Sequence, residues 1–268
     1  KMTNKGAKSN FRFVDKNRAV LALEGEDKID FLQGLTTNNI KNISKEDIVY
    51  TAILSPQGKY LFDFFVFSLS DKEIFIDIHQ SRVGAVKKFL EFYKLNSEVF
   101  IFDKRCQVVL SSMPERVVSF ADPREEILGW RCYDFKEELK IQDRGFDKFQ
   151  INRIKNLVPE TGKELIPETS YILELNFEKM QGVDFKKGCF IGQEVTARMK
   201  HKAILKNKLY CGYIRNNLIE VNDYKIYFND KVVGDLYSIF KNYCLVKIKE
   251  DYKNAQLIVC GEPLTLLN

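Results

Sequence analysis

The sequence predicts an α+β protein that ends in a small β-barrel or sandwich. Over the first 200 residues, short apolar runs alternate with segments whose apolar residues recur every three or four positions, as on one face of a helix. After residue 202 the pattern changes to short β-type runs, which are typical of a small barrel or sandwich. These runs are 209–214, 225–228, 231–240, 243–248, 256–259 and 264–267. A domain boundary is therefore predicted near residue 203, between an α+β region at 10–202 and a β domain at 203–268.

The first predicted elements are a strand and a helix. Residues 19–23 form a short apolar run, and the acidic turn at 24–27 after it is suited to the start of a helix. Ile29, Leu32 and Leu35 are three residues apart and therefore share one face of that helix.

A hairpin and a second helix follow. The β-type runs 50–54 and 60–69 flank the turn Ser-Pro-Gln-Gly at 55–58, as expected of a hairpin. The spacing of apolar residues predicts a helix over 81–94, and 99–102 is the next strand.

The middle of the chain is less regular. Two short strands are predicted at 117–120 and 127–132, and a helix at 146–156. The segment 160–187 then forms a long connection, and long loops in compact domains are often functional.

Composition places limits on the class of protein. Hydrophobic residues make up 45% of the 268 residues and charged residues 29%, a soluble globular profile. No apolar run approaches the roughly 20 residues that span a bilayer, and the polar opening has no signal-peptide core. We expect a cytoplasmic protein with no membrane partner, or a mitochondrial matrix protein if a targeting segment has been removed. A monomer is the default expectation.

The cysteines, histidines and net charge exclude several kinds of site. The six cysteines are widely spaced and the chain has two histidines, so neither a disulfide framework nor a metal site is predicted. The formal charge of +5 suits an anionic small ligand or an acidic partner and is well below a nucleic-acid-binding signature.

The segment 187–198, KGCFIGQEVTAR, is the most informative motif. Gly188 and Gly192 permit a tight turn, and good helix formers follow. Cys189 then lies shortly before a helix N-terminus and close to Lys187, a setting that favours thiolate over thiol. Three interpretations are open for Cys189: a nucleophile, a thiolate ligand for a delivered metal cluster, or a packing residue.

Four other residues are candidates for a site. Asp63 interrupts the apolar run 61–67, so it either binds a partner or faces solvent by strand alternation. Glu194 and Arg198 are four residues apart on one helix face, and they form either a surface pair or a recognition pair for a polar heterocycle or an anionic tail. Asn38 either caps a helix or lines a pocket.

The motif resembles the signature of the YgfZ family, folate-binding relatives of the aminomethyltransferase (T-protein) of the glycine cleavage system. Further segments are similar to that family between about residue 10 and residue 265. They are 30–38, 54–59 with Asp63, 122–124, 128–131, and 233–234 with Ser238. The chain departs from the family pattern at Phe190 and Ile191, which replace a usual Tyr and a common Thr.

The resemblance implies a fold and a function. The fold is a ring of two α+β parts and a C-terminal β-barrel around a central channel that holds tetrahydrofolate. The function is an accessory role in iron-sulfur cluster assembly or repair, with assembly proteins or client iron-sulfur enzymes as partners. Cys189 takes the place of the motif cysteine and Asp63 that of the aspartate serving aminomethyltransferase chemistry, and both are predicted as catalytic. The predicted folate-binding residues are Lys187, Gln193, Glu194, Arg198 and Asn38.

Two other functions are weighed against this one. An aminomethyltransferase of the glycine cleavage type is the first alternative, but the resemblance implies that such enzymes lack the motif cysteine. An RNA-interacting module in tRNA modification is the second, and only the +5 charge favours it.

Overall fold

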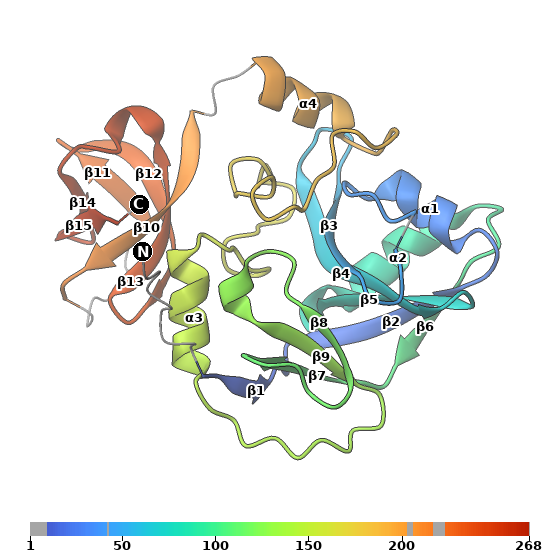
Figure 1. The fold of residues 1–268 in the computed structure, drawn as a ribbon. Helices are drawn as coiled ribbons and strands as arrows, with labels where there is room; N and C mark the ends of the chain where they lie inside the picture. The colour runs from blue at the N-terminus through green and yellow to red at the C-terminus, as the bar shows by residue number, and fades with distance from the viewer. Residues whose placement is uncertain (1–9, 42, 203–205, 217–222, 268) are drawn as a thin grey trace, which may run out of the picture.

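The computed structural model describes residues 10–41, 43–202, 206–216 and 223–267. Two antiparallel sheets and their helices make up the N-terminal part of the chain, and a closed six-stranded barrel makes up the C-terminal part (Figure 1). The predicted α+β class is confirmed. Of the two alternatives for the C-terminal domain, the structure has the barrel and not the sandwich. The predicted boundary near residue 203 lies outside the described residues.

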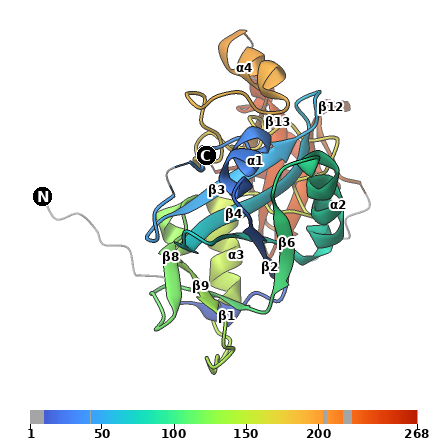
Figure 2. The same cartoon turned by 90° about the vertical axis from the view of Figure 1, so that its right-hand side faces the viewer.

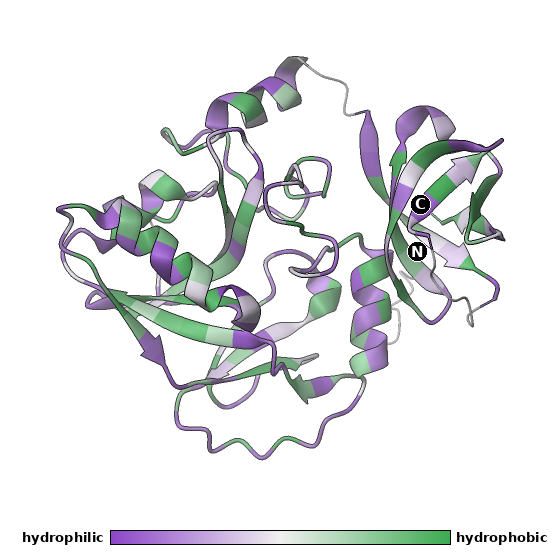
Figure 3. Ribbon diagram, turned by 180° about the vertical axis from the view of Figure 1, so that it is seen from behind, coloured by the Kyte–Doolittle hydropathy of each residue, from purple (hydrophilic) through white to green (hydrophobic). Residues whose placement is uncertain are grey.

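The larger sheet has five strands in the order β3-β4-β5-β2-β6. Its strands are β2 (Arg18–Glu24), β3 (Ile48–Leu54), β4 (Tyr60–Ser70), β5 (Glu73–His79) and β6 (Phe100–Lys104). Helices α1 (Lys28–Leu35) and α2 (Val83–Lys94) contribute Leu32, Val86 and Leu90 to the cluster on one face of this sheet. Hydrophobic and hydrophilic bands alternate along the helices (Figure 3), as expected of helices with one face on a core.

The alternation of strand side chains decides which residues of β4 reach the site. Phe62, Phe64 and Val66 belong to the cluster under the helices. Asp63 and Phe65 therefore lie on the opposite face, because successive side chains of a strand point to opposite faces.

A four-stranded sheet covers part of that opposite face. Its strands are, in sheet order, β1 (Arg12–Val14), β7 (Gln107–Ser111), β9 (Trp130–Asp134) and β8 (Val118–Ala121). Phe67 of β4 and Tyr133 of β9 pack with their ring centroids 4.3 Å apart. The two sheets thus bury a shared aromatic cluster. Figure 2 shows the ribbon of both sheets turned by 90° from Figure 1.

Three strands were not predicted, and one prediction was partly wrong. Strands β1, β5 and β7 had no assignment from the sequence. The strand expected over 127–132 begins only at Trp130, because Glu126–Leu128 form a 3-10 turn that ends at Gly129 with φ of 68°.

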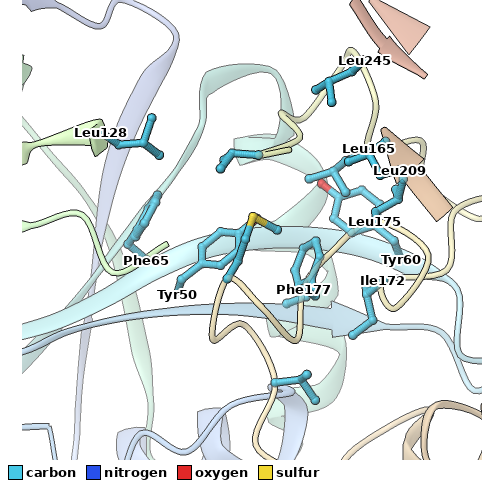
Figure 4. Packing of buried hydrophobic residues seen from close by; sticks show 14 of the residues in the cluster. Tyr50, Tyr60, Phe65, Leu128, Leu165, Ile172, Leu175, Phe177, Leu209 and Leu245 are labelled. Atoms are coloured by element: carbon cyan, nitrogen blue, oxygen red, sulfur yellow. The ribbon is translucent and has the colours of Figure 1, made fainter. Parts of the chain in front are cut away.

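Helix α3 (Phe146–Lys155) leads into the long connection that was predicted from the sequence. Between Lys155 and helix α4 (Gln193–Lys202) the described chain contains no further helix or strand. Side chains of this connection, including Leu165 and Phe177, pack against Tyr50 and Tyr60 of the hairpin (Figure 4). The connection is thus part of the core.

The barrel closes in the order β10-β13-β12-β11-β14-β15. Its strands are β10 (Asn207–Ile214), β11 (Lys225–Phe228), β12 (Lys231–Phe240), β13 (Tyr243–Lys249), β14 (Leu257–Val259) and β15 (Glu262–Leu266). Each of the six β-type runs predicted in this part of the sequence corresponds to one of them.

A buried ion pair joins the barrel to the rest of the chain. The guanidinium of Arg153 in α3 donates to both carboxylate oxygens of Glu164, at 3.1 and 3.2 Å. The hydroxyl of Ser238 in β12 also donates to Glu164. Arg153 and Glu164 are both buried, so one carboxylate holds α3, the long connection and the barrel together.

We predict that Arg153→Met destabilises the protein strongly, because it leaves the buried Glu164 carboxylate without its cation. Loss of one partner of a buried pair costs about 3–5 kcal/mol. The matched control is Arg198→Met, which removes an exposed pair with Glu194 and should cost less than about 1 kcal/mol. Urea unfolding of both variants measures the difference, and similar midpoints would contradict the role given to Glu164.

Candidate functional site

A polar cavity lies where β4 faces the four-stranded sheet and α3. Its apolar wall comes from Phe13, Leu110, Phe146 and Phe149. Its polar wall comes from Arg18, Asp63, His79, Arg124, Arg131, Glu160, Thr161 and Lys163. The cavity therefore places an aromatic surface opposite charged groups.

Asp63 is held in this cavity by three hydroxyl groups. Tyr50 donates to Oδ2 at 2.9 Å, and Tyr60 donates to Oδ1 at 2.7 Å. Thr161, from the long connection, also donates to Oδ1. Asp63 is only 4% exposed, so the alternative in which it faces solvent is wrong. Burial and the adjacent Asp63 raise the pKa of both tyrosines well above the ordinary value, so both hydroxyls remain donors.

A network of buried ion pairs forms the adjoining wall. Arg18 donates to Asp77 Oδ1 at 2.6 Å, and Arg131 donates to Asp77 Oδ2 at 2.7 Å. Burial opposes the charge on Asp77, but Arg131 and Arg18 outweigh it and lower the pKa of that carboxyl. The network links β2 and β5 of one sheet to β9 of the other.

Asp122 and Arg124 extend this network. Arg124 donates to both oxygens of Asp122, at 2.9 and 2.8 Å, and Arg131 lies 3.5 Å from the same carboxylate. The guanidinium of Arg124 lies over the rings of Tyr50 and Phe65, with Cζ 5.4 and 4.9 Å from the two centroids. Arg124 is therefore fixed beside the tyrosine that donates to Asp63.

Glu160 and Lys163 form a charged part of the cavity wall. Lys163 donates to Glu160 at 2.7 Å, and Arg153 lies 3.4 Å from the same carboxylate. Burial disfavours the charge on Glu160, but Arg153 and Lys163 outweigh it and lower its pKa to about 2. Glu160 is an ionised acceptor at neutral pH.

The motif loop is fastened to α1 by Lys187. Its ammonium donates to the carbonyl oxygens of Gln33, Thr36 and Asn38, at 2.7 Å for Gln33 and 2.9 Å for Asn38. Three acceptors match the three donors of an ammonium. Burial lowers the pKa of Lys187 to about 8. The structure thus places Lys187 as a support for the loop that carries Cys189.

Asn38 belongs to the same support. Its side-chain amide donates to the carbonyl oxygens of Tyr50 at 2.9 Å and Gln181 at 2.6 Å. It therefore joins α1, β3 and the long connection, and α1 itself ends one turn earlier, at Leu35.

Cys189 is exposed on the loop, and α4 begins four residues later at Gln193. Glu194 and Arg198 form an ion pair of 2.8 Å on the solvent face of α4, with side chains 84% and 66% exposed. Gln193 is half-buried at the first turn of that helix. Of the described residues that line the Asp63 cavity, none comes from this motif.

The motif and Asp63 are connected through the β3-β4 hairpin. Gly192 has φ of 80°, and a Cβ built there would lie 2.6 Å from the carbonyl oxygen of Ser55. A Cβ at Gly58 would lie 2.8 Å from the Cβ of Val195. The start of α4 therefore rests against the tip of the hairpin whose second strand carries Asp63.

Several residues of the cavity and of the adjoining ion-pair network had no predicted role. Arg124 and Arg131 were noted only as parts of segments similar to the family, and Arg18 and Asp77 were not considered. Asp77 interrupts the apolar run Ile74–Ile78 as Asp63 interrupts its own strand, and that signal was present in the sequence. The partners of Asp77 come from elements distant in sequence, so only the fold reveals them.

Curated proteins similar to this chain include two mitochondrial assembly factors, while no family model matches the chain. "Iron-sulfur cluster assembly factor IBA57 homolog, mitochondrial" of Pyricularia oryzae is 26% identical over 214 residues, and "Iron-sulfur cluster assembly factor IBA57, mitochondrial" of Homo sapiens is 29% identical over 226 residues. Each match covers 72% of this chain. The chain spans 55% of the first relative and 63% of the second.

A solved structure shares the fold. The crystal structure of glycine cleavage system aminomethyltransferase T from Bartonella henselae matches with a TM-score of 0.77, covering 97% of this chain and 85% of that one. The sequence identity is 11%, so the match shows the fold alone. The predicted relationship to the YgfZ family remains a prediction.

We predict that Gly192→Ala displaces α4 from the hairpin and destabilises the protein by about 1–3 kcal/mol, since alanine is strained at positive φ and its Cβ meets a backbone oxygen. Gly188→Ala is the control in the same motif, because a Cβ there meets no described heavy atom within 4 Å. Thermal unfolding compares the two. Equal melting temperatures would mean that the contact with the hairpin is dispensable.

Proposed function

We propose that this protein is a tetrahydrofolate-binding accessory factor in iron-sulfur cluster assembly. The similarity to proteins named as assembly factors carries the cluster-assembly part of this proposal. The Asp63 cavity, in a fold shared with an aminomethyltransferase, supports the folate part.

The chemistry of the cavity fits a folate. The side-chain oxygens of Asp63 and Glu160 can accept N-H groups, as a pterin requires, and Phe13 and Phe149 offer an aromatic surface for stacking. Arg124 and Arg18 supply donors for carbonyl or carboxylate oxygens. The enclosed part of the cavity measures about 90 Å³, which is enough for a few water molecules. The cavity together with its opening to solvent measures about 660 Å³. A bound folate would therefore extend through the opening.

Each group has a defined role in this proposal. Tetrahydrofolate, when bound, supplies nitrogen atoms that carry one-carbon units. Asp63 would orient the pterin and stabilise positive charge on it, because its carboxylate is already fixed by three hydroxyl donors. Lys187 and Asn38 would act indirectly, by holding the motif loop. Gln193, Glu194 and Arg198 would meet the outer part of a folate or a protein partner.

Cys189 would act outside the cavity. An exposed thiol on a supported loop is accessible to a partner protein. One thiolate cannot hold a cluster alone, and the described residues include no group of three or more His, Cys, Asp or Glu placed for a metal. An assembly protein or a client enzyme would supply the remaining ligands, and Cys189 would complete a transient site between the two proteins.

The alternative of an aminomethyltransferase is not favoured, because the curated relatives carry the name of an assembly factor. Turnover in a glycine cleavage assay with the carrier protein would reverse this preference.

The proposed location is the mitochondrial matrix, since the names of the relatives include the word mitochondrial. This proposed location replaces the cytoplasmic location that was expected from the sequence. Within the described residues, no helix is long and apolar enough to cross a membrane.

We predict that Asp63→Asn lowers tetrahydrofolate affinity by about tenfold or more, because a hydrogen bond to a charged group contributes about 1.5–3 kcal/mol. Isothermal titration of the purified protein measures the change. Glu194→Gln, on the exposed face of α4, gives the comparison for a carboxylate outside the cavity. Unchanged affinity in Asp63→Asn would remove Asp63 from the folate site.

We predict that Cys189→Ala retains tetrahydrofolate binding and loses complementation of an iron-sulfur maturation defect, because the exposed thiol is separate from the cavity. Cys106→Ala, a half-buried cysteine elsewhere, should complement normally. If Cys189→Ala complements as well as the unmodified chain, the thiol has no part in the function.

A further inference from the structure

We infer that two copies of this chain pair through the free edge of the five-stranded sheet, β6 against β6, and form a symmetric dimer with one continuous sheet of ten strands. The inference goes beyond the proposed function, because it depends neither on folate nor on Cys189. It follows from an open strand edge, from the apolar side chains exposed along it, and from a residue pattern in β6 that complements itself.

Strand β6 is the last strand of its sheet. Its five residues pair with β2 on one side, and no strand of the described chain pairs with the other side. In an antiparallel pair, alternate residues turn their N-H and C=O groups away from the neighbouring strand. These groups of β6 must therefore meet water or another strand. In the view of Figure 2, β6 and α2 lie on the side that faces the reader.

The side chains beside this edge are apolar and exposed. Phe100 and Phe102 are 50% and 45% exposed, and Phe92 and Leu95, at the end of α2, are more exposed still. The ammonium of Lys94 lies 5.6 Å from the centroid of the Phe100 ring, so the end of α2 adjoins the strand. Exposed apolar patches mark protein interfaces, and an apolar strand at an open edge is suited to pairing with another strand.

The two faces of β6 carry different side chains. Ile101 packs on the cluster beneath α2, and Asp103 accepts from Lys87 of α2 at 2.8 Å. Phe100 and Phe102 lie on the opposite face, because successive side chains of a strand alternate. A two-fold axis perpendicular to the sheet keeps each side chain on its own face. Aromatic residues of one copy therefore meet side chains of the aromatic face of the other.

The residues of β6 select one register for this pairing. With Phe102 on the two-fold axis, all five residues pair, and Phe102 of one copy lies opposite Phe102 of the other. Phe100 then lies opposite Lys104 of the second copy, and Ile101 lies opposite Asp103. An aromatic pair and a cation beside an aromatic ring are both favourable.

The neighbouring registers are less favourable. An axis at Asp103 would place two carboxylates directly opposite each other, and like charges in that position are destabilising. An axis at Ile101 would leave only three of the five residues of β6 paired. The register centred on Phe102 thus uses the whole strand and sets no like charges opposite each other.

The dimer has a consequence for the two motif loops. Strand β3 lies at the far edge of the same sheet, and the tip of the β3-β4 hairpin rests against the motif. The two β3 strands would be separated by nine strand spacings, on the order of 40 Å. Each Cys189 would remain exposed at its own end of the dimer, and the two thiols could not bind one cluster together.

The first test is the mass of the full chain in solution. We expect light scattering to give the monomer mass of 31.3 kDa at about 1 μM and a rise towards twice that value at about 100 μM, as for an interface of modest size. Phe102→Asp should hold the mass at that of the monomer, because it places two carboxylates opposite each other on the axis. Met113→Asp is the control at an exposed apolar residue outside β6, and it should dimerise as the unmodified chain does. Urea unfolding checks that both variants are folded.

The second test locates the axis by cross-linking in the Cys189→Ala background, which lacks the exposed native thiol. Phe102→Cys should form a disulfide-linked dimer on mild oxidation, since directly opposite Cβ atoms lie about 4.5–5.5 Å apart. Phe100→Cys is the control on the same face. Its two copies would be four residues apart along the strand direction, about 13 Å, and should not cross-link.

Three results would overturn the inference. They are a monomer mass at every concentration, a dimer that Phe102→Asp does not dissociate, and cross-linking through Phe100→Cys but not through Phe102→Cys. If the chain is monomeric and Phe102→Asp instead weakens binding to an iron-sulfur assembly protein, β6 serves that partner and the inference is wrong. The proposed function stands in each case, because none of these measurements involves folate or complementation.

Discussion

The buried carboxylate of Asp77 is the interaction on which the rest of the site depends. It pairs with Arg18 of its own sheet and with Arg131 of the other sheet, and Tyr133 donates to it at 2.7 Å. Taking such charges out of water costs several kcal/mol per ion, so the arrangement is stable only when all the partners are present. The two sheets therefore have one relative placement that satisfies these charges, and the cavity follows from it.

The position of Asp63 follows from the same placement. The four-stranded sheet and the long connection cover the face of β4 that carries Asp63 and Phe65. Phe65 receives the guanidinium of Arg131 at 3.9 Å, while Asp63 receives Thr161 of the connection. The Asp63 carboxylate in this apolar strand is thus compensated by Tyr50 and Tyr60 of the same hairpin and by Thr161, which is 98 positions away. The aspartate is embedded in the core while it still lines a cavity.

The sequence predicted much of the fold and less of the site, for physical reasons. Helices α1 and α3, the β3-β4 hairpin and all six barrel strands follow local patterns of apolar spacing and turns. Strand β5 had no assignment, although Asp77 interrupts its apolar run as Asp63 interrupts that of β4. The contacts with Arg18 and Arg131 explain why a charge is stable there. Lys187 was expected to bind a ligand, whereas its ammonium meets carbonyl groups that no local pattern places nearby.

The separation of Cys189 from Asp63 has a consequence for mechanism. The thiol is exposed and the carboxylate is enclosed, and the hairpin β3-β4 touches both the start of α4 and the cavity. Gly58 and Gly192 let the hairpin tip and the motif approach more closely than side chains would permit. A ligand that changes the position of β4 would therefore reach Cys189 through backbone contacts at the hairpin tip. In the proposed function, the hairpin would therefore couple folate binding in the cavity to thiol chemistry at Cys189 without a shared cavity.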